Sequence, residues 1–383
     1  MARIYLDARC ITDKPCGVGR SAGELIRALA RLAPHHDFVV LRHVSNREPA
    51  TTAPNVREEF LARTDDNFVH VAFGARMIRR AFERCGPPDL YHALFHLLPV
   101  GFPGSLKPRP RIVVTGHDLI WLDHPMRLAN KIQGAAIWSY ARVAIPRSIR
   151  LADRVICGTD AMARRFAAFT TPDAVVTIPF GIAAEFFGDV PPLPDPFGSL
   201  GDPGHEFVIA VANSKGYKNL PLLIRAFGLA VRKGLRARLV LVGDCRRLAR
   251  NIDAAGIRDR VVVTGFIPNL DLRALVGRAM LLVHPSLAEG FGLPTLEAMA
   301  LGTPTAISDI ALHREVAADA AMRFDPHDAD ALAAVLLRVE ADAGLRRDLS
   351  QRGRQRAAIY DWTSAALKTL EVYESVLNAD TPS

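Results

Sequence analysis

Two carboxylates, Glu289 and Glu297, are separated by seven residues and bracket a glycine-containing segment, 290–293. The segment has the features of an anion site, but carboxylates repel phosphate, so phosphate binding alone does not explain the acidic pair. The pair is explained if each carboxylate accepts hydrogen bonds from hydroxyl groups on one side of a bound diphosphate. The residues therefore indicate a ligand with a sugar on one side of the phosphates and a ribose on the other.

The residues around this pair predict a strand, a loop and a helix. The apolar run 280–283 predicts a buried strand. Gly290 and Gly292 allow the loop to bend where a side chain would clash, and Pro294 suits the first position of a helix over 295–301. Unpaired N–H groups and the helix dipole meet at such a helix start, so the arrangement predicts an anion site.

The pattern Glu289-x7-Glu297 resembles the EX7E motif of the family 4 retaining glycosyltransferases, which have the two-domain GT-B fold. The surrounding sequence, Pro-Ser-Leu-x-Glu-Gly-Phe-Gly-Leu-Pro-x-Leu-Glu-Ala-Met-Ala-x-Gly-Thr-Pro, is similar to that family throughout. The resemblance implies that Glu289 holds sugar hydroxyls near the reacting carbon and that Glu297 holds the ribose. It implies donor binding by the motif and its loop: Glu289, Gly290, Phe291, Gly292, Leu293 and Glu297. The alternative, that Glu297 only favours the helix dipole, leaves the strand, the glycines and the proline unexplained.

A basic loop follows the apolar run 207–211, which predicts another strand. The loop resembles the family's phosphate-binding segment, in which Lys218 matches the lysine that neutralises the diphosphate as the leaving group departs. Asn213 stands where the family commonly has arginine, and Lys215 and Arg20 are the candidates to supply the missing charge. A solvated lysine at a helix start is the alternative interpretation of Lys218.

Two further sites for the donor come from the resemblance. Phe266 and Ile267 follow the predicted strand 261–265, and relatives hold the nucleotide base at this place. Gly17 and Gly19 lie between a predicted strand over 3–7 and a predicted helix from about residue 21 to 32. In the resemblance this loop lies in the interdomain cleft near the donor phosphates, although a plain structural turn fits the spacing nearly as well.

A histidine at the end of a predicted strand is the third catalytic candidate beside Lys218 and Glu289. The strand over 112–117 ends in His117, and residues just past the carboxyl ends of parallel strands face the ligand crevice. His117-Asp-Leu resembles the family's His-Asp-Leu, which implies a place beside the sugar or the acceptor. A structural or solvated histidine is the alternative. Residues 45–70 are polar and broken by prolines, and they predict a loop region.

The net charge of +8 is concentrated in the first half of the chain, where residues 1–185 contain 25 Lys and Arg against 17 Asp and Glu. The segment 124–152 contains no acidic residue and combines five basic residues with Trp138 and Tyr140. Such a segment is expected either to contact an anionic membrane surface or to form a packed helix with a solvated basic face. The basic residues are not part of a recognisable nucleic-acid-binding module, so no nucleic-acid partner is expected.

The length of 383 residues predicts two domains, 1–185 and 206–360, joined by a proline- and glycine-rich linker, 186–205. Residues 361–383 predict a terminal helix, which in GT-B enzymes crosses back to the first domain. We find no apolar run long enough for a membrane span, no signal-peptide core at the N-terminus, and five scattered cysteines without CxxC spacing. We therefore expect a cytoplasmic protein, either free or peripheral on the inner face of the membrane.

We expect an α/β protein with the GT-B fold, two doubly wound Rossmann-like domains facing a cleft. The expected activity is retaining transfer of a hexose from a nucleotide-diphosphate sugar to a glycan or a lipid-linked glycan. No metal or cofactor is expected, because Asp328-Ala-Asp330 predicts a helix cap and not a metal site. His-Asp-Leu and Lys-Asn-Leu favour GDP-mannose, by similarity to bacterial polysaccharide mannosyltransferases. Two alternatives stay open, a sugar-nucleotide epimerase and a non-catalytic nucleotide- or membrane-binding relative.

Overall fold

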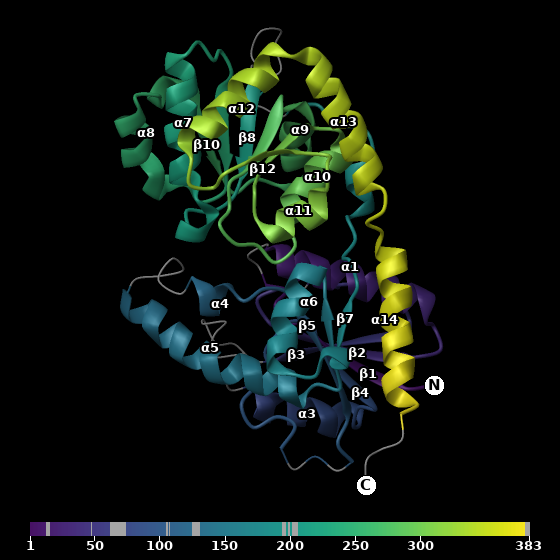
Figure 1. Cartoon of the computed structure of the whole chain (residues 1–383). Coiled ribbons are helices and arrows are strands. Elements are labelled where there is room, and N and C mark those ends of the chain that lie inside the picture. The colour runs from purple at the N-terminus through teal and green to yellow at the C-terminus, as the bar shows by residue number, and fades with distance from the viewer. Residues whose placement is uncertain are drawn as a thin grey trace. The chain divides into compact units, whose positions relative to one another are not determined.

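The computed structural model describes residues 1–12, 16–46, 48–61, 74–104, 106, 108–124, 131–193, 197, 200 and 206–379 (Figure 1). The chain divides by its internal contacts into two compact units. Unit 1 comprises Met1–Leu122, Ala136–Gly181 and Tyr360–Ser383, and unit 2 comprises Asp123–Ala135 and Ile182–Ile359. No helix within the described ranges is both long and apolar enough to cross a membrane.

The described residues of unit 1 form a parallel sheet of seven strands in the order β3-β2-β1-β4-β5-β6-β7. The strands are β1 (Arg3–Asp7), β2 (Asp37–His43), β3 (Val56–Leu61), β4 (Leu90–Ala93), β5 (Arg111–Gly116), β6 (Arg154–Cys157) and β7 (Val175–Thr177). The order reverses between β1 and β4, which makes this the switch point of a doubly wound sheet. The helices from the same stretch of chain, and the C-terminal helix, are α1 (Gly17–Leu32), α3 (Ala75–Cys85), α4 (Ile120–Asp123), α5 (Lys131–Leu151), α6 (Asp160–Phe166), η2 (Ala167–Phe169), η3 (Pro172–Ala174) and α14 (Trp362–Leu377).

The described residues of unit 2 form a second parallel sheet, of six strands, in the order β10-β9-β8-β11-β12-β13. The strands are β8 (Phe207–Val211), β9 (Arg238–Val242), β10 (Val261–Gly265), β11 (Leu281–His284), β12 (Thr305–Ser308) and β13 (Met322–Phe324). Its helices are η4 (Ala184–Phe187), η6 (Gly216–Lys218), α7 (Leu220–Arg232), η7 (Arg246–Leu248), α8 (Ala249–Ala255), η8 (Arg258–Arg260), α9 (Asn269–Arg278), α10 (Leu293–Leu301), α11 (Ala311–Ala317), α12 (Ala329–Ala341) and α13 (Ala343–Ala357). Here the order reverses between β8 and β11. The two predicted Rossmann-like sheets are therefore confirmed.

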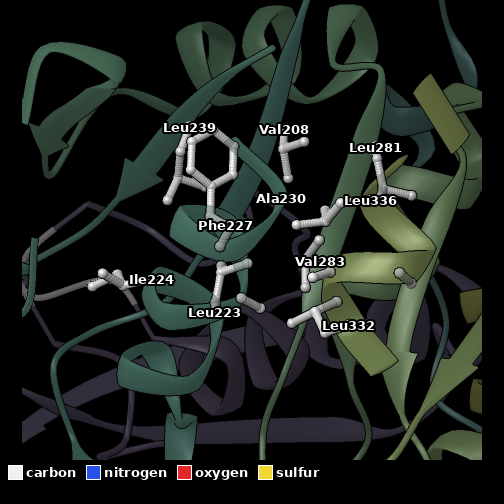
Figure 2. Close-up of a cluster of buried hydrophobic side chains, with 14 of the residues drawn as sticks. Val208, Leu223, Ile224, Phe227, Ala230, Leu239, Leu281, Val283, Leu332 and Leu336 are labelled. Atoms are coloured by element: carbon white, nitrogen blue, oxygen red, sulfur yellow. The ribbon is translucent and has the colours of Figure 1, made fainter. Parts of the chain in front are cut away.

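The core of unit 2 lies between this sheet and the helices α7 and α12 (Figure 2). Phe227 of α7 and Leu332 of α12 are fully buried, together with strand residues such as Leu239 and Val208. Parallel strands are covered on both faces, which is why β8 and β9 have almost continuous apolar sequences without alternation. Burying each large side chain contributes about 1.5–3 kcal/mol, so this core holds the loops at the strand ends in a fixed relation.

Two sequence predictions about local structure were wrong. The first helix begins at Gly17 and not near residue 21, because the cap is Cys16, whose Sγ accepts a hydrogen bond from Gly19 N at 3.4 Å. The region 45–70 was predicted as a loop, but 56–61 form the edge strand β3. An edge strand tolerates polar residues, and Glu58 on β3 accepts a hydrogen bond from the buried Arg42 at 2.9 Å.

The start of the predicted linker is packed and not extended. Phe186 of η4 is fully buried, and Asp189 accepts a hydrogen bond from Arg273 of α9 at 3.2 Å. The contacts of the chain change from unit 1 to unit 2 at Gly181/Ile182. Residues 194–196, 198–199 and 201–205 of the predicted linker lie outside the described residues.

The terminal helix α14 belongs to unit 1, where it packs against α1. Its Tyr373 is fully buried and is hydrogen-bonded through its hydroxyl to His92 Nδ1 at 2.6 Å. His92 Nε2 lies 2.8 Å from Thr115 Oγ1, so both ring nitrogens have partners. Burial, with a smaller contribution from His117, lowers the pKa of His92 to about 3, so the imidazole is neutral. The hydrogen bonds of His92 thus join α14 to β4 and β5.

We expect Tyr373→Phe to lower the free energy of unfolding by about 1–3 kcal/mol, because His92 Nδ1 would remain buried without its partner. Urea denaturation followed by circular dichroism measures this loss. Leu367→Ala on the same helix is the control, because Leu367 is 48% exposed and its truncation should change the free energy by less than about 0.5 kcal/mol. Equal stability of Tyr373→Phe and wild type would show that this hydrogen bond does not hold α14.

Candidate functional site

An ion pair joins the two central loops of unit 2 at the carboxyl ends of its strands. Lys218 Nζ lies 2.6 Å from Glu289 Oε1. Lys218 follows β8 and Glu289 follows β11, the two strands between which the strand order reverses. Ligands of open α/β sheets bind at this switch point, outside the carboxyl ends of the strands. The structure therefore brings together two of the three predicted catalytic residues.

Lys218 is positioned by the short helical turn η6 and its neighbours. Tyr217 is buried, and its carbonyl accepts a hydrogen bond from Leu287 N at 2.8 Å. This backbone bond fixes the loop after β8 against the loop after β11. Asn219 has a left-handed backbone (φ 55°), and its side-chain amide donates to Pro326 O at 2.8 Å. The lysine is thus held at its base while its ammonium group reaches Glu289.

Glu289 has a second partner, His284, which is the last residue of β11. His284 Nε2 lies 2.9 Å from Glu289 Oε1, and His284 Nδ1 lies 2.8 Å from the hydroxyl of Thr295 on α10. A carboxylate oxygen only accepts, so Nε2 carries the proton, and in the neutral ring Nδ1 accepts from Thr295. His284 therefore links the carboxylate to the first turns of α10.

These contacts decide the charge of Glu289. Burial alone would raise the pKa of this carboxyl, but Lys218 and His284 lower it well below its usual range. Only 9% of its side chain and 14% of the Lys218 side chain are exposed. Glu289 is therefore an ionised acceptor throughout the physiological pH range, held inside a weakly solvated site where its hydrogen bonds are strong.

The helix that carries the second glutamate begins directly after this loop. Gly292 adopts a left-handed backbone (φ 84°), which favours glycine, and no side chain caps the N-terminus of α10. Its first N–H groups are therefore directed at the space beside the loop. Glu297 lies inside α10 and is only 5% exposed. The predicted strand, glycine turn and helix are confirmed, with α10 ending before Gly302 as expected.

The remaining donor candidates of unit 2 surround the same strand ends. Asn213 Oδ1 accepts a hydrogen bond from Lys215 N at 3.2 Å, so the asparagine shapes the loop in which it replaces the common arginine. Lys215 lies exposed in this loop. Phe266 follows β10 and is 73% exposed, whereas the neighbouring Ile267 is half-buried. A large exposed aromatic side chain at a strand end is an available stacking surface.

Gly17 and Gly19 lie in the first turn of α1, next to the switch point of unit 1. A side chain at Gly19 would place its Cβ 2.9 Å from Cys10 O, so the helix approaches the preceding loop too closely for any other residue. This steric reason accounts for Gly19 without a ligand. Arg20, a candidate for the missing charge, lies in the same turn of unit 1.

His117 is a buried, neutral histidine at the end of β5. Its Nε2 donates a hydrogen bond to Leu94 O at 3.0 Å, which leaves Nδ1 as the acceptor of the neutral ring. Burial lowers its pKa to about 4, although the Leu94 carbonyl opposes this effect. Phe180 packs between two rings of unit 1, with its ring centre 5.2 Å from that of His117 and 6.2 Å from that of Trp362.

Sequence reasoning missed His284 and Thr295 in unit 2, and a buried ion pair in unit 1. Asp7 accepts hydrogen bonds from Arg9 Nη2 and from the Tyr91 hydroxyl, both at 2.6 Å, at the switch point of unit 1. A histidine or a charged residue at the carboxyl end of a buried strand was the available signal. Asp328, by contrast, caps α12 as predicted and accepts hydrogen bonds from the backbone of the first turn.

Comparison with known proteins identifies the family. Residues 15–186 match the family described as Glycosyltransferase Family 4, and residues 195–356 match Glycosyl transferases group 1. The computed structure is also similar to that of sucrose-phosphate synthase from Thermosynechococcus elongatus, with a TM-score of 0.78 and 20% identity over 99% of this chain and 100% of the other. This likeness supports the GT-B fold.

Two relatives extend the comparison across the chain. The serotype-specific mannosyltransferase WbdA of Escherichia coli is 25% identical over 96% of this chain, which spans 47% of that relative's length. The D-inositol 3-phosphate glycosyltransferase of Saccharomonospora viridis is 30% identical over 80% of this chain and 75% of its own length. The matched regions cover less than half the length of the E. coli mannosyltransferases. On the family models and the second relative, the chain belongs to the family 4 glycosyltransferases.

Proposed function

We propose that the protein is a retaining hexosyltransferase that takes its sugar from a nucleotide-diphosphate donor. The observation that carries this proposal is the Lys218–Glu289 ion pair of 2.6 Å at the switch point of unit 2. A cation for the diphosphate and an acceptor for sugar hydroxyls lie side by side there. Glu297 lies on the helix that begins at the same loop, at the spacing expected for a ribose carboxylate.

The proposed chemistry uses the protein's own charges in place of a metal. As the bond between the sugar and the diphosphate breaks, negative charge grows on the phosphate oxygens, and Lys218 and the N–H groups of α10 stabilise it. Glu289 holds sugar hydroxyls. The acceptor hydroxyl attacks the anomeric carbon from the face that the diphosphate leaves, and its proton passes to the departing phosphate. The resemblance implies that His117 of unit 1 contacts the sugar or the acceptor, and Nδ1 is the atom of its ring that can accept a hydrogen bond.

We propose GDP-mannose as the donor and mannose as the sugar that is transferred. The E. coli relative is named a mannosyltransferase, and its similarity extends over nearly the whole of this chain. The proposed acceptor is a glycan or a lipid-linked glycan in polysaccharide synthesis. A sugar-nucleotide epimerase would turn over the donor without an acceptor, and a non-catalytic relative would bind it without turnover. Donor consumption measured with and without acceptor therefore separates the three functions.

We expect GDP-mannose to raise the melting temperature of the protein more than UDP- or ADP-sugars do.

We expect Glu297→Ala to weaken the binding of GDP-mannose about tenfold to a hundredfold. The reason is the loss of charge-assisted hydrogen bonds to the ribose, which contribute about 1.5–3 kcal/mol. Isothermal titration in EDTA measures the affinity. Glu371→Ala on the exposed side of α14 is the control. Unchanged affinity with a large fall in melting temperature would make Glu297 a structural residue.

We also propose that unit 1 contacts an anionic membrane through the exposed face of α5. Val143 and Trp138 are 69% and 37% exposed on this face. The Arg142 guanidinium lies 4.5 Å from the centre of the Trp138 ring. Arg150 is exposed near the C-terminal end of the same helix. Exposed apolar side chains beside cations are the composition of an interfacial helix.

Not all of the predicted basic segment supports this membrane contact. Arg147 instead donates to the carbonyls of Pro99 and Phe102, so it stabilises a loop within unit 1. Arg127 and the side chain of Lys131 lie outside the described residues.

We expect the double variant Arg142→Ser, Arg150→Ser to bind phosphatidylglycerol-containing vesicles at least about tenfold more weakly at low salt, because each basic residue near the surface contributes about 1 kcal/mol. Sedimentation with phosphatidylcholine vesicles, with and without phosphatidylglycerol, measures binding. Arg247→Ser, Arg250→Ser in unit 2 removes the same charge and should bind like wild type. If wild type ignores the anionic vesicles, or both variants lose binding equally, α5 does not direct the contact.

A further inference from the structure

The two oxygens of the Glu289 carboxylate have different surroundings. Oε1 accepts hydrogen bonds from both Lys218 Nζ, at 2.6 Å, and His284 Nε2, at 2.9 Å. Oε2 accepts none from the residues that the structure describes. The protein thus holds one oxygen with two donors, while the other oxygen is left for a ligand.

The two donors to Oε1 differ in how firmly they are placed. His284 is 2% exposed, ends a buried strand, and is held on its other nitrogen by the buried hydroxyl of Thr295. Lys218 has four methylene groups and a compact ammonium that turns toward any nearby anion. When a diphosphate enters, Lys218 has a second anion to pair with. His284 stays with Glu289, since both of its ring nitrogens already have hydrogen-bond partners.

We propose that His284 is a positioning residue for the donor sugar, which orients Glu289 through Oε1 so that Oε2 accepts a hydrogen bond from a sugar hydroxyl. This inference rests on the proposed function of Glu289 and Lys218. His284 keeps the carboxylate in place while Lys218 turns from Glu289 to the diphosphate. Without His284, the buried Glu289 carboxylate would lose Lys218 as its partner when the donor binds. An unpaired buried charge is unfavourable in free energy.

The other charged or titratable group near Glu289 does not replace His284. His313 of α11 packs against the His284 ring, with 4.7 Å between ring centres. Burial, and then His284, lower the pKa of His313 to about 3, so it is neutral. Its Nδ1 lies 3.0 Å from the carbonyl of Ser308, to which it donates. The donors to the Glu289 carboxylate within the described residues are therefore Lys218 and His284.

Two amide substitutions test the two ring nitrogens of His284 separately. In His284→Gln the side-chain NH2 occupies about the place of Nε2 and can still donate to Glu289. In His284→Asn the amide occupies the place of Nδ1, so it reaches Thr295 but not Glu289. We measure binding of GDP-mannose and of GDP alone, with UDP-glucose and UDP as a second pair. His327→Asn, at an exposed position of unit 2, is the matched control.

We expect His284→Asn to bind the nucleotide-sugar about tenfold more weakly or worse, since it loses a hydrogen bond to a charged group. Binding of the nucleoside diphosphate alone should weaken by a smaller factor, because it draws Lys218 away from Glu289 but makes no hydrogen bond to Oε2. His284→Gln should restore most of the sugar-dependent affinity.

Each other outcome has a definite meaning. If Asn, Gln and wild type bind the nucleotide-sugar equally, His284 does not position Glu289 and the inference is wrong. Equal loss of nucleotide-sugar and free diphosphate in His284→Asn would also overturn it, because the residue would then have no effect specific to the sugar. If wild type binds neither nucleotide-sugar, the proposed function itself fails, which is a distinguishable result.

Discussion

The ion pair between Lys218 and Glu289 is the interaction on which the candidate site depends. Two charges in a weakly solvated pocket need each other, and each is supplied by a different loop. The loops are fixed to one another by the backbone hydrogen bond between Leu287 and Tyr217. The fold of unit 2 itself therefore brings the two charges together, and the charges of the pair sum to zero. Under the proposed function, a diphosphate competes with Glu289 for Lys218, so donor binding is an exchange of ionic partners and not a simple addition.

The sheet topology explains why the ion pair lies where it does. In a parallel sheet all carboxyl ends lie at one edge, and at the point where the strand order reverses the adjacent loops turn away from each other. Unit 2 reverses between β8 and β11 and places Lys218 and Glu289 at that point. Unit 1 reverses between β1 and β4, where the buried Asp7–Arg9 pair lies. The same topology thus leaves a polar site at the edge of each sheet, with an apolar core behind it.

Much of this arrangement could be predicted because its signals are local. The strand before Glu289, the left-handed Gly292 and the helix after it follow from a short sequence with an apolar run, two glycines and a proline at the helix start. What could not be predicted depends on residues far apart in sequence. Lys218 and Glu289 are 71 positions apart, and their contact with each other does not follow from either motif. His284 follows the predicted strand 280–283, and its contacts with Glu289 and Thr295 are formed only in the folded chain. The start of α1 was missed because its cap is a cysteine, and β3 because its polar residues are acceptable at a sheet edge.

A crystal structure of the protein with an intact nucleotide-sugar bound tests the central claim most directly. The account predicts that Lys218 Nζ moves from Glu289 Oε1 to within hydrogen-bonding distance of a diphosphate oxygen. It predicts that Glu289 Oε2 accepts a hydrogen bond from a sugar hydroxyl, while Oε1 keeps its contact with His284. A structure in which Lys218 and Glu289 stay paired and the nucleotide-sugar binds away from the ends of β8 and β11 would contradict it.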